Sequence, residues 1–139
     1  MKEQWIKWEP IANLAPKYYI DKISHTIKDF HIILSEDSST ERKIKILFED
    51  SVDAYRDTDE SFRRKLIYDL GQTYGSNFYG KWTFFKVYNS KYLQWLSEES
   101  FEITNSLGFI HFSLIAADSI LDIVTTYEPK IIIMNENNE

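Results

Sequence analysis

Hydrophobic and polar residues alternate along much of this chain, which predicts strands that bury one face. The alternation predicts strands for five segments: residues 30–34, 43–48, 82–87, 109–117 and 120–127. Weaker strand patterns occur at residues 18–25 and 130–134. Polar residues 35–42 and the pair at 118–119 interrupt the alternation, so two antiparallel hairpins are predicted, the first with a long loop.

Apolar residues at helical spacing mark two further segments. One follows Thr58 and Asp59, either of which can cap a helix N-terminus. Its apolar face consists of Phe62, Leu66, Ile67 and Leu70. The other begins near Asn89 or Ser90 and ends near Ser100. Two helices of moderate length are therefore expected.

The ends of the chain are expected to be less regular than its middle. Residues 1–16 predict an N-terminal arm with a short helix, and the polar residues 135–139 predict a frayed tail. We find no internal repeat and no linker, so residues 1–139 are predicted to form a single domain. The expected fold class is α+β, with an antiparallel sheet of about five strands and two or three helices packed on one face.

Net charge and cysteine content narrow the functional classes. The formal net charge of −6 repels nucleic-acid phosphates, which disfavours DNA or RNA binding, whereas it attracts a basic protein. The chain has no cysteine, which excludes disulfides, thiolate metal ligands and cysteine nucleophiles. No apolar run reaches membrane-spanning length, and the N-terminus has no apolar signal core. We expect a cytoplasmic protein without a membrane partner.

Motifs for catalysis, cofactors and metals are absent from the sequence. The four glycines match no phosphate-binding fingerprint, and no histidine pair has the spacing of metal ligands. The acids between residues 49 and 60 lack the central glycine and the ligand spacing of a calcium loop. We therefore expect no cofactor, no metal site and no enzymatic activity.

His111 and Asp122 are the pair that most invites a catalytic interpretation, because both lie in the second predicted hairpin. If Ala117 faces Ile120 across the turn, His111 faces Thr126. The two side chains then share a face but lie four residues apart, roughly 13 Å at about 3.3 Å per residue. Such a separation is too large for the hydrogen bond of a Ser-His-Asp triad. No Gly-x-Ser-x-Gly elbow occurs either.

An acidic segment is the most informative polar feature. Its six acids, opposed only by Arg56, are Glu49, Asp50, Asp53, Asp57, Asp59 and Glu60. One interpretation is a solvated loop whose last acids cap the following helix. The other is a docking surface for a basic partner, with Tyr55 as an aromatic anchor. We take these seven residues as the candidate partner-binding site.

The aromatic residues between 78 and 95 have two possible roles. Core packing is the simpler one. The alternative is a pocket among Trp82, Tyr88 and Trp95 with a carboxylate or His111 projecting into it. Such a pocket would indicate a small enzyme or a ligand-binding domain. A third alternative is a homodimer formed through an exposed strand at residues 130–134.

The second half of the chain resembles a known family in its sequence texture. The stretches that carry the resemblance are WTFFKVYNSKYLQWL at 82–96, IHF at 110–112, DIV at 122–124 and YEP at 127–129. They resemble small acidic proteins of Bacillus-type bacteria that are similar to the immunity proteins of polymorphic toxins. The resemblance implies a protein that acts by binding, and it carries over no catalytic residue.

These observations lead to one main hypothesis. The chain is an immunity-type inhibitor that neutralises a basic toxin, such as a nuclease domain, by occluding it with the acidic segment. An acidic inhibitor can mimic the phosphate backbone that a nuclease binds, or cover the active site. We expect Asp53, Asp57, Asp59 and Glu60 to make the contacts.

Overall fold

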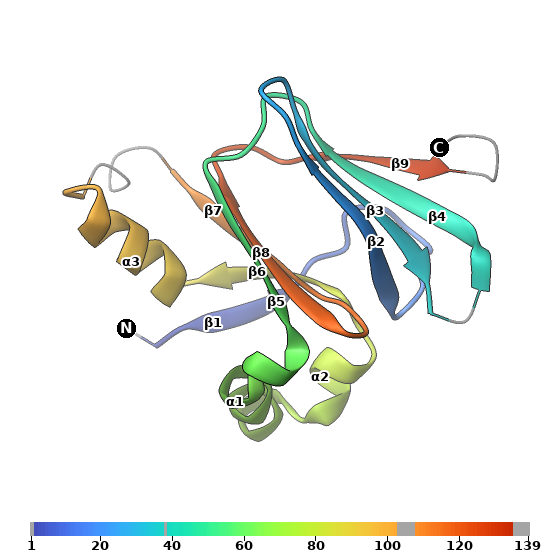
Figure 1. The fold of residues 1–139 in the computed structure, drawn as a ribbon. Coiled ribbons are helices and arrows are strands. Elements are labelled where there is room, and N and C mark those ends of the chain that lie inside the picture. The colour runs from blue at the N-terminus through green and yellow to red at the C-terminus, as the bar shows by residue number, and fades with distance from the viewer. Residues whose placement is uncertain (1, 38, 103–107, 135–139) are drawn as a thin grey trace.

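Two antiparallel sheets face each other in the computed structural model, which describes residues 2–37, 39–102 and 108–134 (Figure 1). The first sheet has the strand order β1 (Gln4–Lys7), β6 (Phe84–Tyr88), β7 (Ile110–Ile115), β8 (Ser119–Thr125), β5 (Ala54–Asp59). The second has the order β2 (Tyr18–His25), β3 (Phe30–Glu36), β4 (Ser39–Phe48), β9 (Lys130–Met134).

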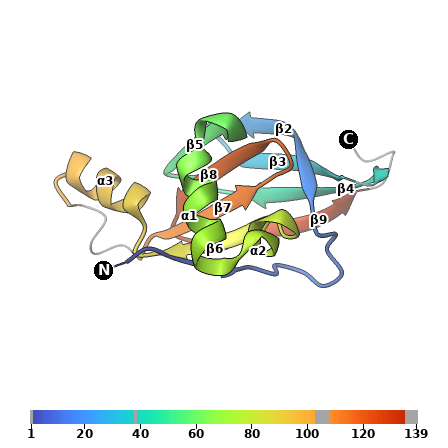
Figure 2. The ribbon, with the colours of Figure 1, turned by 90° about the horizontal axis from the view of Figure 1, so that it is seen from below.

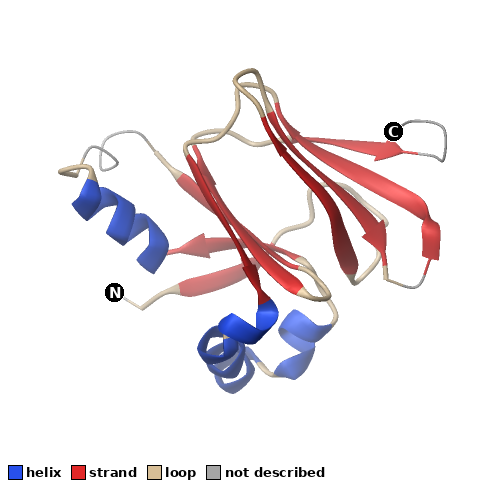
Figure 3. Ribbon diagram, in the orientation of Figure 1, coloured by secondary structure: helices blue, strands red, loops and turns tan. Residues whose placement is uncertain are grey.

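The helices lie on the side of the five-stranded sheet that faces away from the second sheet. They are α1 (Arg64–Tyr74), α2 (Ser76–Gly80) and α3 (Lys91–Glu99), with a short 3₁₀ turn at Glu60–Phe62. Figure 2 shows α1 crossing this face, with α2 beside it. In the described part of the chain, no helix covers the outer face of the four-stranded sheet (Figure 3). The α+β class is confirmed.

The sequence predicted one sheet, whereas the strands form two. A five-stranded antiparallel sheet with helices on one face is present, as expected. The predicted hairpin of residues 30–34 and 43–48, however, belongs to the four-stranded sheet, together with β2 and β9. Alternation shows which side chains of a strand are buried, but it does not show against which layer they pack.

The main core fills the space between the two sheets and is rich in aromatic side chains. Its buried residues are Trp8, Tyr18, Phe30, Ile32, Leu34, Ile44, Ile46, Phe48, Phe84, Phe112, Leu114, Leu121 and Ile123. A second core lies under α1, where Leu66, Ile67 and Leu70 pack towards Phe85 and Ile120. Both faces of the five-stranded sheet are therefore covered, which explains why β7 and β8 are buried along most of their length.

Lys17 ties the two sheets together. Lys17 directly precedes β2 in the chain. Its ammonium group donates hydrogen bonds to the backbone carbonyls of Tyr79, Trp82 and Ile115. All three donors of the ammonium are thus used by main-chain acceptors from the other layer. Burial lowers the pKa of Lys17 from 10.5 to about 8, although nearby Glu60 opposes this shift.

Three local interpretations were wrong. Residues 54–59, interpreted as part of a solvated loop, form strand β5, paired with β8. The N-terminal arm forms strand β1, paired with β6, where a short helix was expected; Trp5 lies opposite Val87 and is buried. Phe62, expected on the apolar face of α1, is 82% exposed. The reason is the 3₁₀ turn before α1, which Asp59 caps by accepting a hydrogen bond from the Ser61 backbone amide. The predicted frayed tail at 135–139 lies outside the described residues.

No helix among the described residues is both long enough and apolar enough to span a bilayer.

Candidate functional site

The acidic segment forms one border of the five-stranded sheet. We call the set Glu49, Asp50, Asp53, Asp57, Asp59 and Glu60 the acidic edge. Its acids lie on and beside β5, which pairs with β8 on one side and is the last strand of its sheet on the other. All six side chains are exposed. A strand of this length extends about 20 Å, so the acids are spread along the border of the sheet.

Tyr55 is only partly available at this border. Its ring is 38% exposed and packs on the ring of Phe30, with 4.7 Å between the ring centroids, and edge-on to His25 at 5.4 Å. Tyr55 therefore closes the border between the two sheets and presents one side of its ring to solvent. This position fits packing between the sheets and also contact with a partner through the exposed side of the ring.

Arg56 is turned away from the acids that surround it in the sequence. The period-2 geometry of β5 places Tyr55 and Asp57 on one face and Arg56 on the other. The Arg56 guanidinium donates a 2.7 Å hydrogen bond to Asp122 and lies 4.1 Å from the ring centroid of Tyr92. The single cation of the acidic segment is thus paired with a buried carboxylate outside that segment.

The structure adds Asp118 to the acidic edge, a residue that sequence reasoning missed. Asp118 lies in the turn between β7 and β8, and it contributes, after burial, to the raised pKa of Asp57. Two acids of the edge have partners: Glu49 pairs with Lys130, and Asp59 accepts hydrogen bonds from Ser61, which lower its pKa.

At one end of the acidic edge lies an open pocket of about 530 Å³. Its lining holds three acids, Asp59, Glu60 and Asp118, and one cation, Arg64, so acids outnumber cations. Ile67 and Tyr68 form its apolar part. Carboxylates beside an apolar wall suit a long basic side chain, whose stem packs on carbon while its charge meets oxygen.

His111 and Asp122 are in contact, which overturns the separation expected from the sequence. The Nε2 atom of His111 lies 2.7 Å from Oδ1 of Asp122. Ile120 was expected to face Ala117, but it faces Ile115, because the turn between β7 and β8 falls one residue earlier than expected. His111 and Asp122 are therefore diagonal neighbours two residues apart along the ladder, within reach of each other's side chains.

This contact continues into a buried chain of hydrogen bonds. Ser90, the N-cap of α3, accepts from the Leu93 backbone amide at 3.0 Å, and its Oγ lies 2.7 Å from Nδ1 of His111. His111 thus bridges two polar groups: Nδ1 shares a hydrogen bond with Ser90, and Nε2–H donates to the Asp122 carboxylate. The Asp122 carboxylate also accepts hydrogen bonds from Arg56 and Arg63 at 2.7 and 2.9 Å.

Asp122 is the centre of this cluster and is fully buried. Burial by itself would raise its pKa, but the hydrogen bond from His111 and the charge and hydrogen bond of Arg56 outweigh burial and hold the pKa well below its usual range. Asp122 is therefore a carboxylate at neutral pH. It joins β8 to β7, to β5 and to the residue before α1.

The order serine, histidine, aspartate is that of a catalytic triad, but three features favour a structural role. Ser90 is only 3% exposed. Its Oγ is already engaged by the amide of Leu93, as a helix N-cap. The Asp122 charge is shared with two guanidinium groups, which reduces its ability to stabilise an imidazolium. The cluster connects α3 and β5 to the sheet.

The aromatic pocket suggested by the sequence does not assemble from its three named residues. Trp82 packs against Phe84 and donates to the Trp8 carbonyl. Trp95 stacks on Tyr92 along α3. Tyr88, the last residue of β6, is exposed. His111 is buried among its hydrogen-bond partners and projects into no cavity with them.

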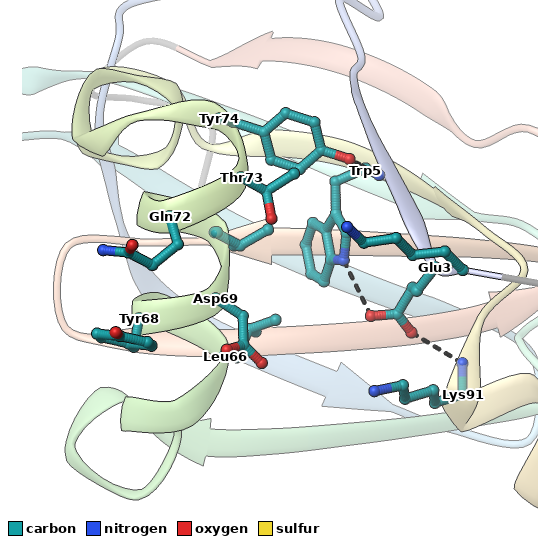
Figure 4. A pocket seen from close by; sticks show the side chains of 11 residues that line it. Glu3, Trp5, Leu66, Tyr68, Asp69, Gln72, Thr73, Tyr74 and Lys91 are labelled. Atoms are coloured by element: carbon teal, nitrogen blue, oxygen red, sulfur yellow. Dashed lines mark hydrogen bonds between the residues drawn. The ribbon is translucent and has the colours of Figure 1, made fainter.

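A different pocket of about 440 Å³ lies between α1 and β1 (Figure 4). In it the Glu3 carboxylate accepts hydrogen bonds from the indole of Trp5 and from the first backbone amide of α3, that of Lys91. Tyr74 accepts from the Trp5 backbone amide at the far wall. These polar groups satisfy one another, so the pocket has no unpaired group aimed at a ligand among them.

Among the described residues, no group of three or more histidine, cysteine or acidic side chains is placed to hold a metal ion. No family model matches the chain, and neither a curated protein nor a solved structure matches it.

Proposed function

We propose that this chain is a protein-binding domain that receives a basic partner on its acidic edge, acting as an immunity-type inhibitor that occludes a toxin. The observation that carries the proposal is the placement of Arg56. Its guanidinium lies on the opposite face of β5 and pairs with Asp122, so it does not neutralise the carboxylates beside it.

One acid of the edge, Asp57, is held at an electrostatic cost. Burial and the nearby Asp118 raise the pKa of Asp57, so the charged form of this carboxylate is disfavoured in the folded chain. Among the described residues, no ion pair is formed by Asp50, Asp53, Asp57 or Glu60. Groups that cost stability without a structural return are typical of binding sites.

The geometry of β5 supports docking in a second way. An outer strand presents unpaired backbone amides and carbonyls along its free side, a ready template for another chain. A basic partner can place cations against the acids while its backbone approaches this strand. The carboxylate-lined pocket next to Tyr68 then takes a lysine or arginine side chain. The proposed mechanism is steric and electrostatic occlusion, with no chemical step.

The test takes a toxin domain from a neighbouring gene, where the genome encodes one, and measures its binding to this chain by calorimetry at low and high salt. We expect tight binding that weakens as salt rises, because exposed charge pairs are screened. The variant Asp53→Asn/Asp57→Asn/Glu60→Gln should lose most of the affinity. The matched control, Glu9→Gln/Glu98→Gln/Glu99→Gln, changes the net charge equally at exposed positions away from β5.

Equal weakening by both triple variants would show that only overall charge matters and would remove the acidic edge as the site. Absence of binding at either salt concentration would refute the proposal. Binding that is indifferent to salt would leave occlusion and remove its electrostatic part.

A further inference from the structure

In the described part of the chain, four strands end the two sheets, and three of them carry features that oppose pairing with an identical copy of the chain. Strand β1 is only four residues long. Strand β2 has a bulge between Ile20 and Lys22, with Asp21 exposed within it. Strand β5 carries the exposed charges of the acidic edge. Short edges, bulges and charges are the devices by which natural sheets protect their borders.

Strand β9 has none of these devices. It is the last strand of the four-stranded sheet, it pairs with β4 without a register shift, and the four residues 131–134 are uncharged. Its one charge, Lys130, is at the end of the strand and is engaged by Glu49. Two isoleucines of β9 remain open to solvent, with Ile132 at 40% and Ile133 at 55% exposed.

The two exposed isoleucines lie on different faces of the sheet. Ile131 and Ile133 pair with Ile46 and Ile44, which are buried in the main core, so they point towards the space between the sheets. Ile132 pairs with Lys45 and points outward. Ile133 therefore presents an apolar side chain to solvent at the border of the core layer.

We propose that β9 pairs with β9 of a second copy of this chain, antiparallel about a two-fold axis at Ile132. In this register Ile132 lies opposite Ile132 of the other copy, and Ile131 lies opposite Ile133. Every cross-strand pair between 131 and 133 is then isoleucine with isoleucine, a favourable combination on a sheet surface. The pairing covers Ile133 and joins two four-stranded sheets into one continuous sheet.

A second copy fits this border better than a charged partner does. The strand is uncharged at residues 131–134, so it offers a charged peptide no ion pair, and its apolar sequence is complementary to itself in the two-fold arrangement. Asp53, Asp57, Asp59 and Glu60 of the acidic edge lie on or beside β5 in the other sheet. Glu49 follows β4, and its charge is paired with Lys130 of the same copy.

The contact is small, and a weak dimer is therefore expected. Pairing of one short strand buries less than the ~1,200 Å² of stable, specific interfaces. We expect a dissociation constant of about 0.1 mM or higher, so that the dimer forms only in concentrated solution. The proposal is independent of the binding of a basic partner.

Sedimentation velocity of the full chain, from about 10 µM to about 1 mM, tests the proposal. The wild type should shift from monomer towards dimer across this range. Ile132→Lys and Ile132→Glu should each stay monomeric, because like charges then meet on the two-fold axis. The control Ile27→Lys, at a side chain that is 98% exposed beyond β2, should dimerise as the wild type does.

A mixture of the lysine and glutamate variants decides the register. Opposite charges meet at position 132 in the mixed pair, so the mixture should recover the dimer that each variant alone has lost. A wild type that stays monomeric throughout, or an Ile132→Lys variant that still dimerises, would overturn the proposal. A mixture that stays monomeric would overturn the two-fold register at Ile132.

Discussion

The imidazole of His111 donates to the carboxylate of Asp122 across 2.7 Å, from a position two residues out of step on the neighbouring strand. Both side chains lie on the face of the five-stranded sheet that the helices cover. Because Asp122 also receives Arg56 and Arg63, one buried carboxylate holds together four separate segments of the chain. Its role in stability is therefore open to direct measurement.

Removal of the Asp122 charge should destabilise the fold strongly. In Asp122→Asn, the guanidinium groups of Arg56 and Arg63 lose their common counter-charge, and breaking a buried ion pair in this way costs about 3 kcal/mol. Urea unfolding measures this loss. The control is Asp69→Asn, which breaks an exposed pair with Lys65 and should cost less than about 0.5 kcal/mol. Similar losses in the two variants would contradict the central role of Asp122.

The hydroxyl of Ser90 should matter more than an ordinary helix hydroxyl. Ser90→Ala removes the N-cap of α3 and leaves Nδ1 of buried His111 without its hydrogen-bond partner, a combined loss of about 2 kcal/mol in the free energy of unfolding. Ser100→Ala, at the other end of the same helix, loses only bonds to carbonyls of the preceding turn and should cost about 0.5 kcal/mol or less. Equal costs would show that the bond to His111 contributes nothing.

Lys17 should make the protein more stable as the pH rises above 8. Its pKa is lowered to about 8 in the folded chain from 10.5, so above pH 8 the unfolded chain binds more protons at this residue than the folded one. The free energy of unfolding then increases with pH through this window. Lys17→Met keeps the length of the side chain and should abolish the increase. A titration of Lys17 by NMR with a midpoint near 10.5 would contradict this prediction.

Neutralising Asp57 should stabilise the fold slightly while weakening partner binding. Burial and Asp118 raise the pKa of this carboxylate, so its charged form opposes folding at neutral pH. Stability from this group therefore increases as the pH falls through the raised pKa, the reverse of the usual carboxylate behaviour. Asp57→Asn should gain up to about 0.5 kcal/mol in urea unfolding at pH 7, since the site is largely exposed. A clear loss of stability would show that the charge has a structural partner.

Much of the secondary structure was predictable from local pattern. The hairpin of β3 and β4, the strands β6, β7 and β8, and the apolar face of α1 follow from alternation or helical spacing, because these periods reflect which side chains meet the core. The N-cap at Ser90 was predictable for a similar reason, since capping depends on residues close in sequence. The acids of the candidate site were also found from sequence, because all lie in one short segment.

The register of the hairpin between β7 and β8 was decided by tertiary contacts. The turn is placed one residue earlier than expected, and the Ala117 amide donates to the carbonyl of Tyr18 in the other sheet. That bond joins segments almost a hundred residues apart, so no local pattern reveals it. A shift of one turn residue moves facing partners by two, and this shift brought His111 to Asp122.

The sequence by itself determined which residues of β3 and β4 are buried and that one segment concentrates negative charge. Only the tertiary structure decided how the strands divide into two sheets. It also placed Asp118 beside the acidic edge and turned the Arg56 side chain away from that edge towards Asp122. The physical reason is range: periodicity and capping act within a few residues, whereas layer assignment, ion pairing and register depend on segments that meet only when the chain is folded.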